Sequence, residues 1–137
     1  FTLECFINVT SFVTYGTFAS DQPGDTNGAG TYFWRINNNT NQWQFQIGSG
    51  SGFSQAINSS TDLTLNTWHH IAVTRSGTSI QLWQDGVEVG SGTSSVDFNN
   101  TQTLYIGALT NYQFTGYISN FRIVHMLIHF HHLHKIH

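Results

Sequence analysis

The chain has 137 residues, of which 15% are aromatic and only 8% are charged, and its formal net charge is −3 with neutral histidines. With four Lys and Arg residues in all, it offers no electrostatic basis for binding nucleic acid, and we expect no nucleic-acid partner. Its one cysteine, Cys5, excludes an intrachain disulfide and a Cys-based metal site. No apolar run approaches the roughly 20 residues that cross a bilayer, so we expect no membrane insertion.

Period-two alternation of apolar and polar residues predicts a series of short strands. The expected strands are residues 1–8, 12–20, 32–36, 42–47, 53–57, 68–75, 79–84, 87–89, 103–106 and 115–124. Polar segments rich in Gly and Asn separate them, without a convincing helix before residue 125 or an internal repeat. This spacing is typical of an all-β fold, an antiparallel two-sheet β-sandwich or jelly roll.

The clearest local signal lies in residues 66–92, where two hairpins follow one another. Asp85 and Gly86 separate two alternating runs, and this dipeptide predicts a type I′ turn because both central residues need φ > 0. His69 and His70 stand in the preceding strand. We interpret them as framework residues rather than catalytic ones, because no nucleophile-elbow sequence accompanies them.

Five motifs, in order along the chain, resemble strands of the laminin-G-like, concanavalin A-like jelly-roll domains. They are FTLECF (1–6), WHHIAVTR (68–75), LWQDG (82–86), LYIG (104–107) and FTGYISNFRI (114–123). The subtype is similar to domains of phage tail and fibre proteins and of extracellular adhesins. The resemblance implies a jelly-roll domain over residues 1–124. It also implies an earlier strand that this chain lacks, which would leave an exposed sheet edge.

The resemblance favours a non-catalytic carbohydrate- or surface-binding module of a larger extracellular or virion-associated protein, with a glycan or cell-surface ligand as its partner. The alternative is a structural spacer or assembly domain of a fibre, a homo-oligomer that binds no sugar. Glycoside hydrolysis is disfavoured, because no two acidic residues alternate along one strand, whereas retaining enzymes hold two carboxyls about 5 Å apart. We therefore expect no enzymatic activity.

A lectin-like site stacks an aromatic ring on a sugar face and hydrogen-bonds the hydroxyls with amide groups. Trp83, Trp34 and Tyr112 are the candidate rings, and Asn37, at the start of an Asn-rich loop, is a candidate amide. For each ring the competing interpretation, that it packs inside the sandwich, stays open. Alternation and the family pattern predict that Trp43 and Trp68 belong to the core.

Many relatives bind Ca²⁺ through loop carboxylates and carbonyls at the rim of the sandwich. Asp21, Asp25 and Asn27 could supply such oxygens, as could Asp97 with Asn99. Neither loop reproduces a ligand motif position by position. Solvated loop acids are therefore the simpler interpretation, and the sequence establishes no cofactor.

Residues 125–137 (HMLIHFHHLHKIH) differ in composition from everything before them. His125, His129 and His132 lie at i, i+4 and i+7, one face of a helix, a spacing suited to imidazole ligation of Zn²⁺ or Ni²⁺. Adventitious binding of added Ni²⁺ is favoured over a native metal site, and a tail without a metal role over both. One back-translation, read two bases out of phase, gives Tyr-Ala-Tyr-Thr-Phe-Pro-Pro-Ser-Pro, which is similar to the family's ending. We hypothesise a frameshifted ending, which the coding DNA would test.

Overall fold

The computed structural model describes residues 1–21, 28–37, 40–98, 103–108 and 111–124, with the backbone alone at 53 and 54. Its strands are β1 (Thr2–Val9), β2 (Thr17–Ser20), β3 (Tyr32–Ile36), β4 (Trp43–Gly48), β5 (Phe53–Asn58), β6 (Trp68–Ser76), β7 (Ser79–Gln84), β8 (Val87–Thr93), β9 (Tyr105–Ile106) and β10 (Gly116–Val124). The predicted all-β fold is confirmed. None of the described residues belongs to a helix that could cross a membrane.

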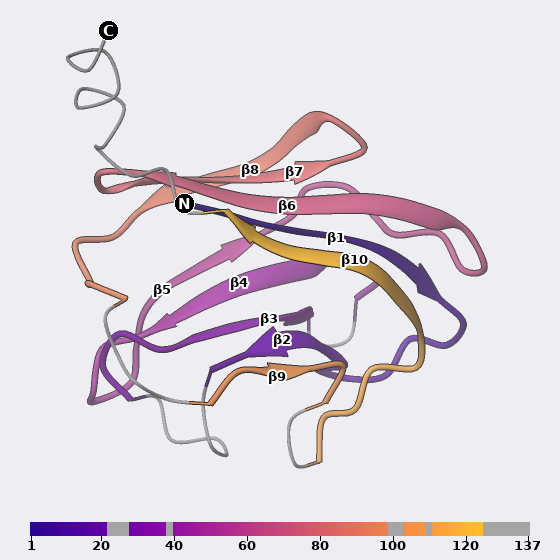
Figure 1. Ribbon diagram of the computed structural model, residues 1–137, viewed down its shortest axis with the longest axis horizontal. Helices are drawn as coiled ribbons and strands as arrows, with labels where there is room; N and C mark the ends of the chain where they lie inside the picture. The colour runs from indigo at the N-terminus through magenta and orange to yellow at the C-terminus, as the bar shows by residue number, and fades with distance from the viewer. Residues whose placement is uncertain (22–27, 38–39, 99–102, 109–110, 125–137) are drawn as a thin grey trace, which may run out of the picture.

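The strands form two five-stranded antiparallel sheets that lie one above the other (Figure 1). Sheet A has the strand order β10-β1-β6-β7-β8, and sheet B has the order β5-β4-β3-β2-β9. The predicted two-sheet sandwich is therefore confirmed. The first and last strands pair directly, with Thr2 opposite Val124 and Val9 opposite Gly116. β10 and β9 are edge strands of the two sheets, and both carry exposed apolar residues.

Turns determine where several strands begin or end. Asp85 and Gly86 have φ values of +52° and +81°, as the type I′ turn requires. The strand predicted from residue 12 begins only at Thr17, because the chain turns before it. Tyr15 has a φ of +59° and the Gly16 N–H donates to the Val13 carbonyl over 2.9 Å.

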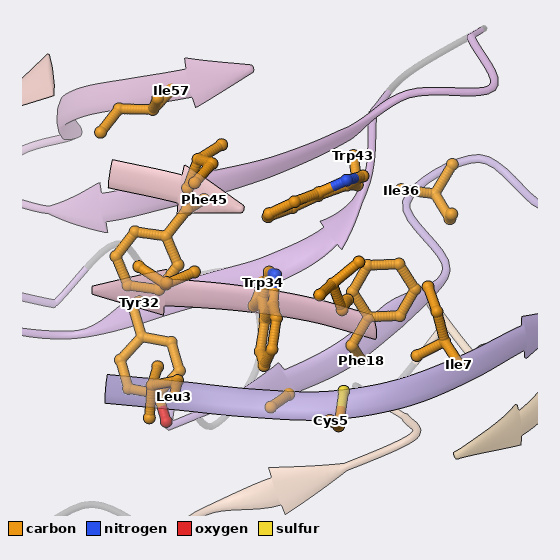
Figure 2. Close-up of a cluster of buried hydrophobic side chains, with 14 of the residues drawn as sticks. Leu3, Cys5, Ile7, Phe18, Tyr32, Trp34, Ile36, Trp43, Phe45 and Ile57 are labelled. Atoms are coloured by element: carbon orange, nitrogen blue, oxygen red, sulfur yellow. The ribbon is translucent and has the colours of Figure 1, made fainter. Parts of the chain in front are cut away.

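The core lies between the sheets, where alternate residues of facing strands pack together (Figure 2). The burial predicted for alternate residues of 1–8 is confirmed. In 42–47 the apolar residues Trp43, Phe45 and Ile47 are buried as predicted, but Gln44, expected on the polar face, is buried as well. Trp43 also links the sheets through a buried hydrogen bond. Its Nε1 donates to Gln84 Oε1 over 2.8 Å, and Gln84 Nε2 donates to the Asp62 carbonyl over 3.0 Å. The carbonyl oxygen and the amino group of the Gln84 side chain therefore both have hydrogen-bond partners inside the sandwich.

Cys5 is a core residue with 1% of its surface exposed. Desolvation raises the pKa of its thiol to about 12, and the charge of neighbouring Glu4 adds to the rise. The thiol therefore stays protonated and unreactive at neutral pH.

A β-bulge shapes the pairing of β1 with β10. The register shifts between Glu4 and Phe6, and Asn120 has a φ of +53°. The shift brings Arg122 opposite Glu4 on the face of sheet A that points away from the core. Arg122 Nε donates to Glu4 Oε1 over 2.8 Å, and His70 Nε2 lies 3.3 Å from Glu4 Oε2. The hydrogen bond from Arg122 is the main cause that holds the pKa of the Glu4 carboxyl below its usual value of 4.5.

We expect Glu4→Gln to reduce the free energy of unfolding at neutral pH and to have little effect in acid. Because the folded-state pKa of Glu4 lies below its unfolded value, its contribution is present above about 4.5 and is lost as the pH falls through the folded-state pKa. Urea unfolding of both proteins across this pH range measures the difference. Glu88→Gln is the control, because the Glu88 carboxylate accepts from Gln81 and contacts no cation among the described residues. If the difference in the free energy of unfolding between Glu4→Gln and the wild-type protein stayed constant into acid, the prediction would be contradicted.

Candidate functional site

A cavity of about 470 Å³ opens at the end of the sandwich where β1 begins. We call it the end pocket; its lining residues are Phe1, Leu3, Asp21, Tyr32, Arg75, Gly77, Asp97, Phe98, Leu104 and Ile123. Residues of both sheets line it, because β1, β3, β6 and β10 all begin or end at this place. Its volume lies within the range of small-molecule sites.

Aromatic rings form one wall of the end pocket. The ring of Phe98 meets those of Phe1 and Tyr32 edge to face, at centroid distances of 5.6 Å and 6.0 Å. The Arg75 guanidinium lies over the same Phe98 ring, 4.9 Å from its centroid. Desolvation raises the pKa of Tyr32 above its usual range, with a contribution from Asp21, so the phenol remains a neutral hydrogen-bonding group. The wall can pack against the C–H face of a ligand.

Charged groups form the other part of the end pocket. Asp21 Oδ1 accepts the Tyr32 N–H over 2.7 Å, which fixes the carboxylate at the start of β3. Arg75 donates from Nε to the Gly77 carbonyl and from Nη2 to the Ser94 carbonyl, each over 2.9 Å. These bonds hold the guanidinium in place. Asp97 adds a second, exposed carboxylate, so one pocket presents two acidic groups and one basic group.

The structure bears in part on the predicted calcium ligands. Asp21 and Asp97 come to one pocket, whereas Asp25, Asn27 and Asn99 lie outside the described residues. Ca²⁺ takes about 6–8 oxygen ligands. Within the described part of the chain no three His, Cys, Asp or Glu side chains gather in a metal-binding group. A calcium site therefore stays a prediction.

The candidate sugar-binding rings lie in three different places. Trp34 has no exposed surface, and its ring packs against Phe18 and Trp43 in the core, with centroids 6.0 Å and 6.1 Å away (Figure 2). The hypothesis that Trp34 stacks on a ligand is therefore wrong. Trp83 lies half-buried on the outer face of sheet A, where its Nε1 donates to Thr74 Oγ1 over 2.9 Å.

Tyr112 belongs to a separate cluster on the outer face of sheet B. Its ring lies 5.5 Å from that of Tyr15, and the Arg35 guanidinium lies 4.1 Å from the Tyr15 centroid and 4.6 Å from that of Phe33. Arg35 is only 4% exposed, so this cluster offers a ligand little cationic surface. Asn37 is half-buried, and its N–H donates to the Gln42 carbonyl over 2.8 Å.

The two histidines of β6 point to opposite faces. His69 is buried, with Nδ1 2.7 Å from Asp85 Oδ2 and Nε2 accepting the Thr64 N–H over 3.1 Å. Both ring nitrogens are thus engaged, and neither is available as a general base. His70 instead lies on the outer face of sheet A beside Phe6. These contacts suit the framework role expected for both.

Two residues depart from the sequence analysis. Trp68 was expected in the core, but it is 50% exposed, because the inward positions of β6 belong to His69, Ile71 and Val73. Sequence reasoning also missed Arg75 as a pocket residue, since the motif that it ends, WHHIAVTR, indicated only a strand. His125, His129 and His132 lie outside the described residues.

Comparisons with known proteins agree with the sandwich. Solved structures similar to this chain include a candidate carbohydrate-binding protein of Bacteroides ovatus ATCC 8483 (TM-score 0.70, 20% identity, 88% of this chain and 36% of that one). Mouse laminin α1 domains LG4-5 match with a TM-score of 0.69 and 15% identity, over 88% of this chain and 34% of that one. The Ruminococcus gnavus IT-sialidase CBM40 bound to α2,3 sialyllactose matches with a TM-score of 0.64 and 8% identity, over 88% and 70%.

The chain thus spans about a third of the length of the first two structures. At these identities the likeness shows the fold alone. No curated protein matches the chain. Residues 1–127 match the family model described as the Concanavalin A-like lectin/glucanases superfamily, so this chain belongs to that superfamily.

Proposed function

We propose that this chain is a non-catalytic carbohydrate-binding module that holds a neutral sugar in the end pocket. One observation carries the proposal: the pocket combines an aromatic wall with fixed charged groups. A sugar ring offers C–H groups that pack on aromatic faces and hydroxyls that hydrogen-bond to carboxylates and guanidinium groups. Phe98 and Tyr32 would supply the first kind of contact, and Asp21, Asp97 and Arg75 the second.

The charges of the pocket favour a neutral sugar over an acidic one. Among the described residues that line it, Asp21 and Asp97 outnumber Arg75, so an anionic ligand would meet more like than opposite charge there. The Bacteroides ovatus and Ruminococcus gnavus structures support carbohydrate as the class of ligand. The sialic acid of the second does not suit this pocket.

Binding without hydrolysis is the better interpretation of the two carboxylates. A retaining glycosidase holds its two carboxyls about 5 Å apart, whereas no two acidic residues of this sequence alternate along one strand. We place the module in a larger extracellular protein, of which a virion-attached fibre is one setting. A fibre spacer without sugar binding is the second candidate, and it predicts no glycan ligand at all.

A glycan array, probed in calcium chloride and again in EDTA, tests the proposal. We expect neutral glycans to bind, and Asp97→Asn to raise the Kd about tenfold, because a charge-assisted hydrogen bond is lost. Asp62→Asn is the matched control, since Asp62 is exposed and lies outside the pocket. Equal binding in calcium chloride and in EDTA would show that glycan binding does not require calcium.

Three results would count against the proposal. Binding of no glycan would favour the spacer, and an equal Kd for Asp97→Asn and the wild-type protein would move the site elsewhere. The third result is hydrolysis of the glycan, which chromatography before and after incubation with the protein would detect. Shortened products would show that the chain is an enzyme.

A further inference from the structure

The outer face of sheet A, opposite to the one that packs on the core, carries a group of exposed aromatic side chains. Phe6 of β1, Trp68 of β6 and Tyr117 of β10 are 42%, 50% and 62% exposed. Large apolar side chains grouped on a surface mark binding sites more often than single ones do. We call these three residues the outer aromatic strip.

Strand register brings the strip together. Asn8 of β1 pairs with Tyr117 on one side and with Trp68 on the other, and the two ring centroids lie 6.5 Å apart at 40°. One row further along β1, Phe6 pairs with His70, and their rings lie 5.0 Å apart. Glu4 continues the same face, so the surface from Glu4 to Asn8 extends about 13 Å along the strand. That length suits an extended oligosaccharide better than a single sugar.

A polar atom beneath the strip indicates a ligand that donates hydrogen bonds. Asn8 Oδ1, between Trp68 and Tyr117, is buried and has no hydrogen-bond partner among the residues that the structure describes. Because this oxygen has almost no accessible surface, a ligand hydroxyl reaches it only when the half-exposed Trp68 and Tyr117 side chains move apart. The hydrogen bond then recovers the free energy that an unpartnered acceptor costs. An apolar protein surface laid on the two rings would leave this oxygen unsatisfied.

The charges on this face indicate that the ligand is neutral. Glu4 is paired with Arg122 and hydrogen-bonded to His70, so the charged groups beside the strip balance one another. Such a surface complements an uncharged molecule that has both C–H faces and hydroxyls. A second copy of this chain fits less well, since it would bring a second unsatisfied Asn8 oxygen to the contact.

We propose that the outer aromatic strip is a second carbohydrate-binding surface, which binds a neutral oligosaccharide along β1. Trp68 and Tyr117 stack against sugar rings, Asn8 Oδ1 accepts a hydroxyl proton and Phe6 extends the surface. The inference rests on the proposed carbohydrate binding, but it concerns a different face of the sandwich from the end pocket.

Tryptophan fluorescence can test the strip directly. Of the four tryptophans, Trp34 and Trp43 are fully buried and Trp83 is half-buried, so Trp68 is the one most open to acrylamide. The probes are cellohexaose, maltohexaose, mannohexaose, xylohexaose and chitohexaose, each with its monosaccharide. We expect at least one hexasaccharide, and no monosaccharide, to protect Trp68 from quenching.

Variants then locate the binding. Trp68→Ala and Tyr117→Ala should each raise the Kd of that hexasaccharide about tenfold. Both side chains are at least half exposed, so the melting temperature should change little. Val87→Ala is the control, because Val87 is an exposed apolar residue of the same sheet outside the strip. Should Trp68→Ala fail to fold, Tyr117→Ala carries the same test.

The outcomes separate the two sites. A hexasaccharide that binds with Trp68 unprotected, and with an unchanged Kd in both strip variants, would overturn the strip and leave the end pocket standing. Loss in the strip variants with an unchanged Kd in Asp97→Asn would support the strip and show that this hexasaccharide does not bind in the end pocket. Absence of binding by every probe would overturn the strip. Protection of Trp68 that grows with protein concentration alone would show self-association and overturn it too.

Discussion

Replacing Gly116 with alanine is expected to reduce the free energy of unfolding by about 3 kcal/mol or more. Gly116 has a φ of +151°, which L-residues rarely adopt, and a Cβ there would overlap the Asn8 carbonyl oxygen and lie 3.0 Å from Phe114 Cζ. The carbonyl belongs to backbone and cannot rotate away. The substitution must therefore push the start of β10 off β1, the pairing that joins the two ends of the chain. Urea unfolding measures the loss.

Gly77→Ala separates the clash from backbone strain. Gly77 also has a positive φ, +59°, but no atom lies within 4 Å of a Cβ built there. We expect it to cost only the strain of a left-handed residue, about 1 kcal/mol. Similar losses for the two variants would mean that the approach of β10 to Asn8 is not as close as described.

Trp34→Ala is expected to cost about 3–5 kcal/mol, the range for removing a large aromatic side chain from a core. Its ring contacts Phe18, Trp43 and Phe121 and has no exposed surface, so alanine leaves a cavity between the sheets. The thermal midpoint and urea unfolding both report the loss. A residue that stacked on a ligand at the surface would leave both unchanged.

Trp83→Ala provides the comparison on the outer face. Trp83 is half-buried and its indole N–H donates to Thr74 Oγ1, so we expect a loss of about 1 kcal/mol. If Trp34→Ala proved as mild as Trp83→Ala, the assignment of Trp34 to the core would be contradicted.

The predicted strands were correct wherever one face of a strand is apolar and the other polar. In β1, Leu3, Cys5 and Ile7 face the core as the alternation predicts, and the Asp85 turn formed as its dipeptide requires. In β3 the predicted bounds are correct, but the hypothesis that Trp34 stacks on a ligand failed, because all five residues of the strand are buried. When both faces of a strand are covered, period two no longer indicates which side meets the other sheet.

The sequence by itself determined the class of fold, because alternation and turn residues are local properties that neighbouring amino acids specify. Only the tertiary structure decided which surfaces are covered and which strand ends meet. Trp68 lies at an outward position that packing leaves open, so it became a binding candidate instead of a core residue. Asp21 and Asp97 lie far apart in the chain and share a pocket only because two sheets stack with their ends together. Long-range pairing of this kind depends on how the whole sandwich closes, which no local pattern encodes.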